Sequence, residues 1–424
     1  MSKVKHIPQG YKDSPLGIIP KEWEVKRLGE LCTKIGSGVT PRGGQNVYLS
    51  QGRPFLRSQN VANGYLLLDD VVFIDEITHQ KQKSTEIELD DVLLNITGAS
   101  IGRSAVATSE IVGGNVNQHV CIIRLKDKTL SYYICAFLLS YIGQKQIDSY
   151  QAGGNREGLN YDQIASFKIF IPSSKEIIQI WNFLSLWDTA IEKQSELIEK
   201  LKLRKRALMQ QLLTGKKRLP GFSGEWKRIK LGDIAERITR KNEEDNKNVV
   251  TISAQRGFVV QTDFFNKSVA SETLDNYYLV HKDEFCYNKS YSNGYPMGAI
   301  KRLTAFDKAV VTTLYICFRL KESSNINIDF FEQYCESGIF NKELVKVANE
   351  GGRAHGLLNV TPSDFFNMHM KIPSIEEQNA IATVLFNADK EIELANKKLN
   401  NLQSQKRGLM QQLLTGKIRT TNFE

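Results

Sequence analysis

Side chains that can read or hold DNA are concentrated in glycine-rich stretches in both halves of the chain, such as LRSQNVANG (56–64) and YNKSYSNGY (287–295). Arg, Asn and Gln pair with the edges of guanine and adenine, Lys and Arg neutralise phosphates, and glycine lets a backbone approach closely. Any one of these residues is more often an ordinary turn residue, but their accumulation in two otherwise different segments favours recognition. The residues that we expect to bind DNA are Arg42, Gln45, Arg57, Gln59, Asn60, Arg103, Asn117, Gln118, Gln255, Arg256, Asn288, Lys289, Tyr291 and Asn293.

No pattern typical of catalysis or of a cofactor site occurs in the sequence. GASIGRS (98–104) has the glycines of a phosphate-binding loop at the wrong spacing and lacks its lysine. The six histidines are isolated and the six cysteines form no CxxC pattern, so the usual zinc spacings are missing. Glu225 and Lys227 resemble the tail of a nuclease motif, but the preceding Pro-Asp is absent. We therefore expect no catalytic residue, no metal ligand and no cofactor, and a chain that is not an enzyme.

The composition is that of a globular protein with a basic excess. The 424 residues suffice for two or more cores, and the formal net charge of +9 modestly favours a polyanionic partner. The longest apolar run, 132–143, is too short to cross a bilayer, and we expect it to lie in a helix around 130–147. The first residues lack the apolar core of a signal peptide. We expect a cytoplasmic protein without a membrane partner, whose cysteines are buried thiols.

The elements that must position the polar loops are marked by an internal repeat. The nonapeptide LMQQLLTGK occurs at 208–216 and again at 409–417. Both halves also begin alike, because Trp23 and the residues after it correspond to Trp226 and the residues after it. Between these anchors the halves differ almost completely. The sequence therefore predicts two copies of one scaffold with different middle segments.

A long amphipathic helix is predicted at the end of each half. Apolar residues recur in a heptad a/d pattern from Ile177 to Leu212 and from Ile381 to Leu413. The polar exceptions in these series are Gln194, Lys205, Gln378 and Lys406. Prolines precede both helices, and the glycines that stop them are Gly215 and Gly416.

Two such helices in one chain are expected to pair about a pseudo-twofold axis, which makes them antiparallel and places the globular domains at opposite ends. The alternatives are that a helix packs against its own domain or forms a coil with another molecule. We expect an α+β fold in which two mixed α/β domains alternate with the two helices. The predicted boundaries are a first domain over 1–174, a helical region over 175–219, a second domain over 220–373 and a second helical region over 374–424.

The sequence resembles the specificity subunits of type I restriction-modification systems over essentially its whole length. The resemblance is carried by VTPRGGQNVYLSQGRPFLRSQNVANGYL (39–66), LLNITGASIGRSAV (93–106), CYNKSYSNGYPMGAIKR (286–302) and the repeated LMQQLLTG. It implies that the two middle segments are target-recognition domains that read a bipartite, usually asymmetric DNA sequence. It also implies two modification subunits that methylate adenine with S-adenosylmethionine, and ATP-driven restriction subunits. No catalysis by the chain itself is implied.

The repeated nonapeptide then suggests the same partner surface presented twice, once for each modification subunit. The residues that we expect to contact these partners are Gln210, Gln211, Gln411 and Gln412. Two other functions compete with this interpretation. One is a stand-alone enzyme acting on nucleic acid, against which the missing carboxylate cluster argues. The other is a coiled-coil scaffold that binds only protein, which leaves the Arg, Asn and Gln loops unexplained.

Overall fold

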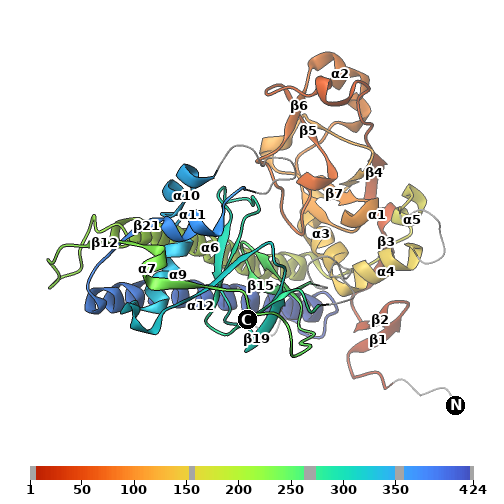
Figure 1. The fold of residues 1–424 in the computed structure, drawn as a ribbon. Helices are drawn as coiled ribbons and strands as arrows, with labels where there is room; N and C mark the ends of the chain where they lie inside the picture. Colours follow the sequence, from red (N-terminus) through yellow and green to blue (C-terminus); the bar gives the residue numbers. More distant parts are fainter. Residues whose placement is uncertain (1–5, 152–157, 262–273, 349–357, 421–424) are drawn as a thin grey trace. The chain divides into compact units, whose positions relative to one another are not determined.

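A computed structural model describes residues 6–151, 158–261, 274–348 and 358–420 of the chain. The chain divides into two compact units (Figure 1). Unit 1 contains residues 1–194 and 398–424, and unit 2 contains residues 195–397. Each unit therefore holds one globular domain, called domain 1 or domain 2 below, with the start of one long helix and the end of the other.

Domain 1 is built around an antiparallel four-stranded sheet in the order β4-β10-β7-β8. The strands are β4 (Cys32–Ser37), β7 (Val92–Asn95), β8 (Ser104–Val106) and β10 (Val120–Leu125). All four residues of β7 are buried, because helix α3 (Ser131–Leu139) covers one face of the sheet and a second apolar cluster fills the other. The central strand thus has the continuous apolar character of a strand that is buried on both faces.

Smaller elements surround this sheet. The paired strands are β1 (Tyr11–Ser14) with β2 (Gly17–Pro20), β3 (Glu24–Arg27) with β11 (Lys168–Ile171), and β5 (Arg53–Leu56) with both β6 (Val72–Ile74) and β9 (Asn115–Val116). The further helices of domain 1 are α1 (Leu28–Leu31), α2 (Glu76–Lys81), α4 (Tyr141–Gln151) and α5 (Tyr161–Ala165).

Domain 2 repeats the same sheet in the order β13-β20-β17-β18. Its strands are β13 (Ala235–Ile238), β17 (Phe285–Asn288), β18 (Ala299–Arg302) and β20 (Ile316–Leu320). The other pairs are β12 (Lys227–Lys230) with β21 (His369–Ile372), β14 (Val250–Ser253) with β15 (Gly257–Val260), and β16 (Tyr278–His281) with β19 (Lys308–Val311). Its helices are α7 (Leu231–Ile234), α9 (Ile328–Glu336), α10 (Asn341–Val347) and α11 (Pro362–Asn367).

The two domains share their frame and differ at its periphery. In both, a strand leads through one turn of helix into the first strand of the central sheet, as β3, α1 and β4 do in domain 1 and β12, α7 and β13 do in domain 2. Domain 1 adds the β6-β5-β9 sheet, whereas domain 2 adds the β14-β15 and β16-β19 pairs. The common scaffold predicted from the repeat is confirmed, and it extends into the middle segments whose sequences do not match.

Helix α6 (Ser174–Leu212) and helix α12 (Ile375–Leu413) each contain 39 residues, about 60 Å of helix, as the heptad pattern predicted. Each is followed by a glycine in the left-handed region, Gly215 at φ +69° and Gly416 at φ +68°. A side chain would be strained at these two positions, so the glycines end the helices.

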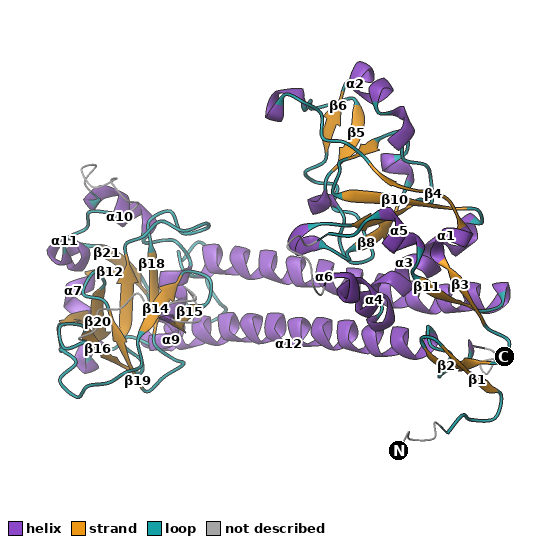
Figure 2. Ribbon diagram, turned by 90° about the vertical axis from the view of Figure 1, so that its right-hand side faces the viewer, coloured by secondary structure: helices purple, strands orange, loops and turns teal. Residues whose placement is uncertain are grey.

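The two helices form an antiparallel coiled coil within the chain. In unit 1 the start of α6 lies beside the end of α12, where Asp188 forms an ion pair with Lys406 (Figure 2). In unit 2 the end of α6 lies beside the start of α12, where the Lys205 Nζ lies 2.6 Å from the Asp389 Oδ1. The polar breaks at Lys205 and Lys406 are thus equivalent positions at which each helix is tied to the other.

The start of each helix also packs on the globular domain that precedes it. Pairing of the two helices and packing of a helix on its own domain, which the sequence left as alternatives, therefore occur together. Ile177, Ile180 and Leu184 at the start of α6 belong to the core of domain 1. Ile381 and Leu385 at the start of α12 belong to the core of domain 2.

One predicted element is corrected by the structure. The apolar segment 130–147 indicated a single helix, but α3 ends and α4 begins at Ser140. The backbone of Ser140 is extended, with φ −71° and ψ +163°, and its Oγ accepts a hydrogen bond from the Gly143 N at 3.2 Å. Ser140 therefore acts as an N-cap for α4, which apolar periodicity alone does not reveal.

Candidate DNA interface

The predicted DNA-binding loops of domain 1 meet at one end of its central sheet. Residues 38–42 follow β4, residues 96–103 connect β7 to β8, and residues 117–119 precede β10. Adjacent antiparallel strands bring these loops to the same edge. The Gly38 N donates to the Asn117 O at 3.2 Å, and the Ile96 N donates to the His119 O at 3.0 Å. We call these three segments edge loops 1.

Three predicted residues on edge loops 1 have exposed side chains, namely Arg42, Arg103 and Gln118. Gln118 accepts a hydrogen bond from the Thr40 hydroxyl, and its Nε2 lies 3.0 Å from the His119 Nε2. The side chain of Gln45 lies outside the described part of the structure. Edge loops 1 therefore present two cationic side chains, Arg42 and Arg103, and one amide side chain, Gln118, at one exposed edge of the sheet.

Sequence reasoning missed two residues at this edge. The Tyr161 hydroxyl lies 2.5 Å from the Ser37 Oγ and accepts from the Ser37 N at 3.1 Å, while the side chain remains 44% exposed. The His119 Nδ1 lies 2.5 Å from the Thr97 Oγ1. Tyr161 lies outside the glycine-rich stretches, so only the fold brings it to the edge.

Two predicted residues of domain 1 are buried and do not face solvent. Asn60 is fully buried, and its Nδ2 donates to the Leu67 O at 3.0 Å and to the Asp70 Oδ1 at 2.7 Å. Asn117 is only 6% exposed, and its Oδ1 accepts from the His119 N at 3.1 Å. Because these hydrogen bonds fix the loops from inside, we withdraw both residues as base contacts.

Arg57 and Gln59 are both held by Asp70, the first through its backbone carbonyl and the second through its carboxylate. The Arg57 Nη2 donates to the Asp70 O at 2.9 Å, and the guanidinium lies over the ring of Tyr48 at 5.8 Å. Gln59 is exposed but donates to the Asp70 Oδ2. Both side chains would have to exchange an intramolecular partner before they could contact DNA.

We expect that Arg103→Ala weakens DNA binding by about 1–3 kcal/mol and relaxes the sequence preference at one position, as for an arginine that contacts guanine. Arg57→Ala is the comparison, and it should mainly lower the stability of domain 1. Fluorescence titration of the complex at several salt concentrations measures the first effect, and urea unfolding measures the second. If Arg103→Ala weakened binding to all sequences equally and flattened the salt dependence, the side chain would be a phosphate contact instead.

In domain 2 the predicted residues cluster at the corresponding end of the sheet. Residues 289–298 connect β17 to β18, and residues 312–315 precede β20; we call them edge loops 2. The Asn288 Nδ2 donates to the Ile252 O at 3.3 Å, and the Gln255 Nε2 donates to the Asn293 O at 2.9 Å, so the β14-β15 turn joins this edge. Tyr291 is 66% exposed and Asn293 is also exposed. The side chain of Lys289 is half-buried.

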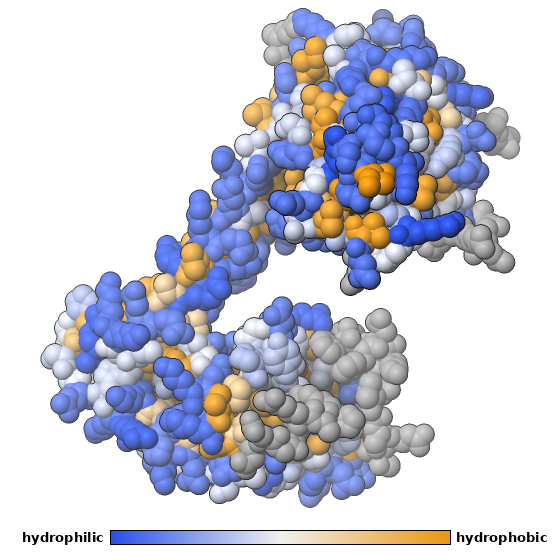
Figure 3. Space-filling view, turned by 90° about the horizontal axis from the view of Figure 1, so that it is seen from above, coloured by the Kyte–Doolittle hydropathy of each residue, from blue (hydrophilic) through white to orange (hydrophobic). Residues whose placement is uncertain are grey.

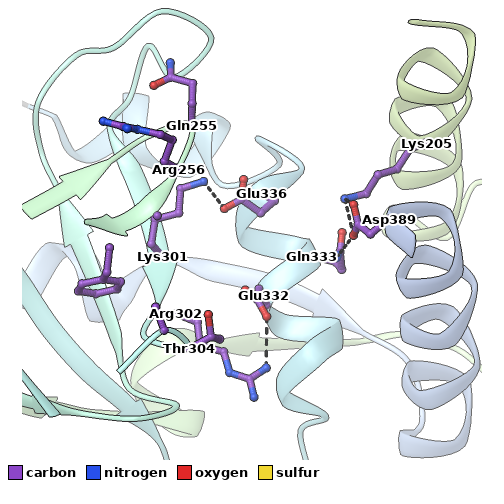
Figure 4. A pocket seen from close by; sticks show the side chains of 13 residues that line it. Lys205, Gln255, Arg256, Lys301, Arg302, Thr304, Glu332, Gln333, Glu336 and Asp389 are labelled. Atoms are coloured by element: carbon purple, nitrogen blue, oxygen red, sulfur yellow. Dashed lines mark hydrogen bonds and ion pairs between the residues drawn. The ribbon is translucent and has the colours of Figure 1, made fainter. Parts of the chain in front are cut away.

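A cavity of about 330 Å³ lies between the β14-β15 turn, α9 and the helix pair of unit 2 (Figure 4). Its cations are already paired, because the Lys301 Nζ lies 2.5 Å from the Glu336 Oε1 and the Arg302 Nη1 lies 3.2 Å from the Glu332 Oε2. Burial raises the pKa of Glu332. Arg256 lines this cavity and also has interactions within the chain. Three carboxylates, Glu332, Glu336 and Asp389, line the cavity beside its four cationic side chains, so the cavity is a poor phosphate site.

A second constellation explains the repeated peptide. In unit 1 the Arg419 Nε donates to the Glu176 Oε1 at 2.7 Å, and the Trp23 Nε1 donates to the Glu176 Oε2 at 2.9 Å. The guanidinium lies over the ring of Trp23 at 5.9 Å. A Cβ on Gly416 would lie 2.5 Å from Pro20 and 3.3 Å from Trp23, so only glycine fits there.

The arginine, glutamate and glycine contacts recur in unit 2, but the Trp226 Nε1 is buried and makes no hydrogen bond there. Arg218 donates to both carboxylate oxygens of Glu377 at 2.6 Å and lies over the ring of Trp226 at 5.8 Å, against which Gly215 also packs. Because these carboxylates accept charged hydrogen bonds, the pKa values of Arg218 and Arg419 are raised. We call each set a clasp: it joins the end of one long helix to the first turn of the other and to the tryptophan that directly precedes β3 or β12.

Comparison with known proteins decides the family. The family model described as "Type I restriction modification DNA specificity domain" matches residues 20–203 and again residues 223–404. The chain belongs to this specificity family. Both matches cover one domain and most of the helix that follows it.

Two curated relatives come from Methanocaldococcus jannaschii. The "Putative type I restriction enzyme MjaX specificity subunit" is 24% identical over 439 residues and covers 97% of each chain. The "Type I restriction enzyme MjaVIII specificity subunit" is 22% identical and covers 96% of this chain and 95% of the relative. A chain in a solved structure concerned with complex assembly and conformational transition of a type I restriction-modification system aligns with a TM-score of 0.57. That alignment covers 94% of this chain and 99% of that chain at 14% identity, so it shows the shared fold.

For this specificity family member, the candidate partner residues lie at the helix ends beside the clasps. Gln211 and Gln412 are exposed, and Gln411 is half-buried. Gln210 is exposed, but its Nε2 donates to the Ser337 O at 3.0 Å. Gln210 therefore also anchors α9 to the helix.

The described part of the chain holds no group of three or more His, Cys, Asp or Glu side chains suited to a metal ion. No helix among the described residues has a stretch long and apolar enough to span a bilayer. The face seen in Figure 3 is mainly hydrophilic, with apolar residues in small groups.

Proposed function

We propose that this specificity subunit reads a bipartite DNA sequence, with edge loops 1 reading one half and edge loops 2 reading the other. The observation that carries the proposal is that polar loops of different sequence occupy the same end of the same sheet in two domains. A shared frame with two different edges supports two independent readers. The paired helices act as the spacer between the half-sites.

The partners follow from the repeated architecture. Each unit presents one clasp with exposed glutamines beside it, so we infer two equivalent sites for modification subunits. Restriction subunits join through that assembly. The chain supplies sequence recognition, and the methylation and cleavage chemistry belongs to the partners. The stand-alone enzyme and the purely protein-binding scaffold are set aside on the strength of family membership.

The proposal is tested by reconstituting the purified chain with a modification subunit from the same host. The chain alone should bind DNA in a salt-dependent way and should transfer no methyl group. With the partner and S-adenosylmethionine, adenine methylation should appear at one bipartite sequence. Methylation by the chain alone, or methylation without sequence preference in the complex, would contradict the proposed role.

A further inference from the structure

Two buried thiols face each other across the central sheet of domain 2. Cys286 on β17 and Cys317 on β20 are directly opposed in the antiparallel register. The Cys286 Sγ donates to the Cys317 Sγ at 3.2 Å, and both residues are fully buried.

The backbone geometry at this position suits a covalent bond between the two sulfurs. Directly opposed residues of antiparallel strands have Cα atoms about 4.5–5.5 Å apart. Disulfides are formed across Cα separations of about 4.4–6.8 Å. The bond can therefore form with only small movements of β17 and β20.

Domain 1 shows that this layer of the core does not need thiols. Leu93 on β7 and Ile122 on β10 are opposed in the same way, and they lie, like the two cysteines, on the face of the sheet away from the helix-covered core. Both Leu93 and Ile122 are buried. Apolar side chains fill this position in one domain, so packing alone does not explain a cysteine pair in the other.

We propose that Cys286 and Cys317 are an oxidative modification site that forms a reversible disulfide inside domain 2. With hydrogen peroxide as the oxidant, one thiol loses its proton, the thiolate attacks a peroxide oxygen, and the O–O bond breaks to give a sulfenic acid and hydroxide, which takes up the released proton to become water. The second thiol also loses its proton, its thiolate attacks the sulfenic sulfur, and the S–O bond breaks; the hydroxide that leaves takes up this second proton and becomes the second water. Two thiols and one peroxide thus give one disulfide and two waters.

Burial controls how fast this reaction proceeds. Removal from water raises the pKa of the Cys286 thiol, and the thiolate is the reactive form. Peroxide also needs a local opening of the sheet to reach the sulfurs. The disulfide would tie together the two strands that lead into edge loops 2, and this consequence for DNA reading rests on the proposed function.

The test uses the complete chain and no DNA, so its outcome is independent of the proposed function. The folded protein is treated with hydrogen peroxide, the remaining thiols are alkylated in denaturant, and the digested protein is analysed by mass spectrometry. In a second arm the protein is unfolded and refolded in a glutathione redox buffer, so that burial no longer limits access.

We expect a peptide that links Cys286 to Cys317, two fewer alkylated thiols per chain, and complete reversal by dithiothreitol. The urea midpoint of domain 2 should rise on oxidation and return on reduction. Cys286→Val, which removes one thiol and keeps an apolar side chain at this position, should abolish all of these effects while the other five cysteines remain. If neither arm yielded the linked peptide, or if Cys286→Val lost the same number of thiols, the modification site would be excluded.

Discussion

Arg419→Ala is expected to lower the free energy of unfolding of the chain by about 3 kcal/mol, because it leaves a buried carboxylate without its cation. The Glu176 side chain is only 1% exposed, and its described partners are Arg419 and the Trp23 Nε1. Since the tryptophan remains, the loss should fall at the lower end of the range for a broken buried pair. Arg218→Ala should destabilise unit 2 in the same direction, through Glu377.

Arg407→Ala is the matched control, because Arg407 is an exposed arginine in the last turns of α12, the helix that Arg419 follows in the chain. Its effect should stay within about 0.5 kcal/mol. Urea unfolding followed by circular dichroism measures all three variants. A double variant that also carries Glu176→Gln should recover part of the loss, because the glutamine carbonyl oxygen can still accept from Trp23 and no charge is left unpaired. Equal effects of Arg419→Ala and Arg407→Ala would show that the clasp does not hold unit 1 together.

The clasp changes the meaning of the repeated nonapeptide. From the sequence, the repeat suggested a partner surface needed twice, and the glutamines within it remain candidates for that role. The structure adds an intramolecular reason: the helix end, its glycine and the arginine after it dock on a tryptophan and a glutamate of the same unit. The pattern could be seen in the sequence, but the glutamate partners lie 159 and 243 residues away from Arg218 and Arg419, so local reasoning could not pair them.

The long helices were predictable because a heptad pattern is a local property that fixes helix length and the buried face. Their antiparallel pairing followed from symmetry, and the polar breaks at Lys205 and Lys406 proved to be ion-paired with the opposite helix. The sequences of the two halves match only at their beginnings and ends, so the shared central sheet between these matches could not be predicted. A buried strand requires only that its residues be apolar, so two strands can take the same place without matching in sequence.

The candidate site was predictable by residue type and only partly by position. Glycine-rich loops with Arg, Asn and Gln do gather at one sheet edge in each domain. Composition could not separate an exposed reader such as Arg103 from a loop-fixing residue such as Asn60, because both occur in the same kind of segment. That distinction depends on tertiary hydrogen bonds, here those made by Asp70.

The second large effect is expected from exchanging residues 40–151 for the corresponding segment of another member of the family. The junctions fall just after β4 and at the end of α4, so the strands β3, β4 and β11 and the clasp stay native. All of the exposed candidates in edge loops 1 lie inside the exchanged segment. We therefore expect one half of the recognised sequence to be replaced completely, while the other half is still read by domain 2. Exchanging residues 240–347 is the matched variant and should replace the opposite half.

Mapping of methylated adenines is the measurement that tests this two-reader account most directly. DNA from cells that carry the exchanged chain with its modification subunit is compared with DNA from cells that carry the native chain. The account predicts a bipartite methylated sequence in which one half is new and the other is unchanged, and the reverse pattern for the exchange in domain 2. A change in both halves on exchange of domain 1 alone, or no change in either, would contradict it.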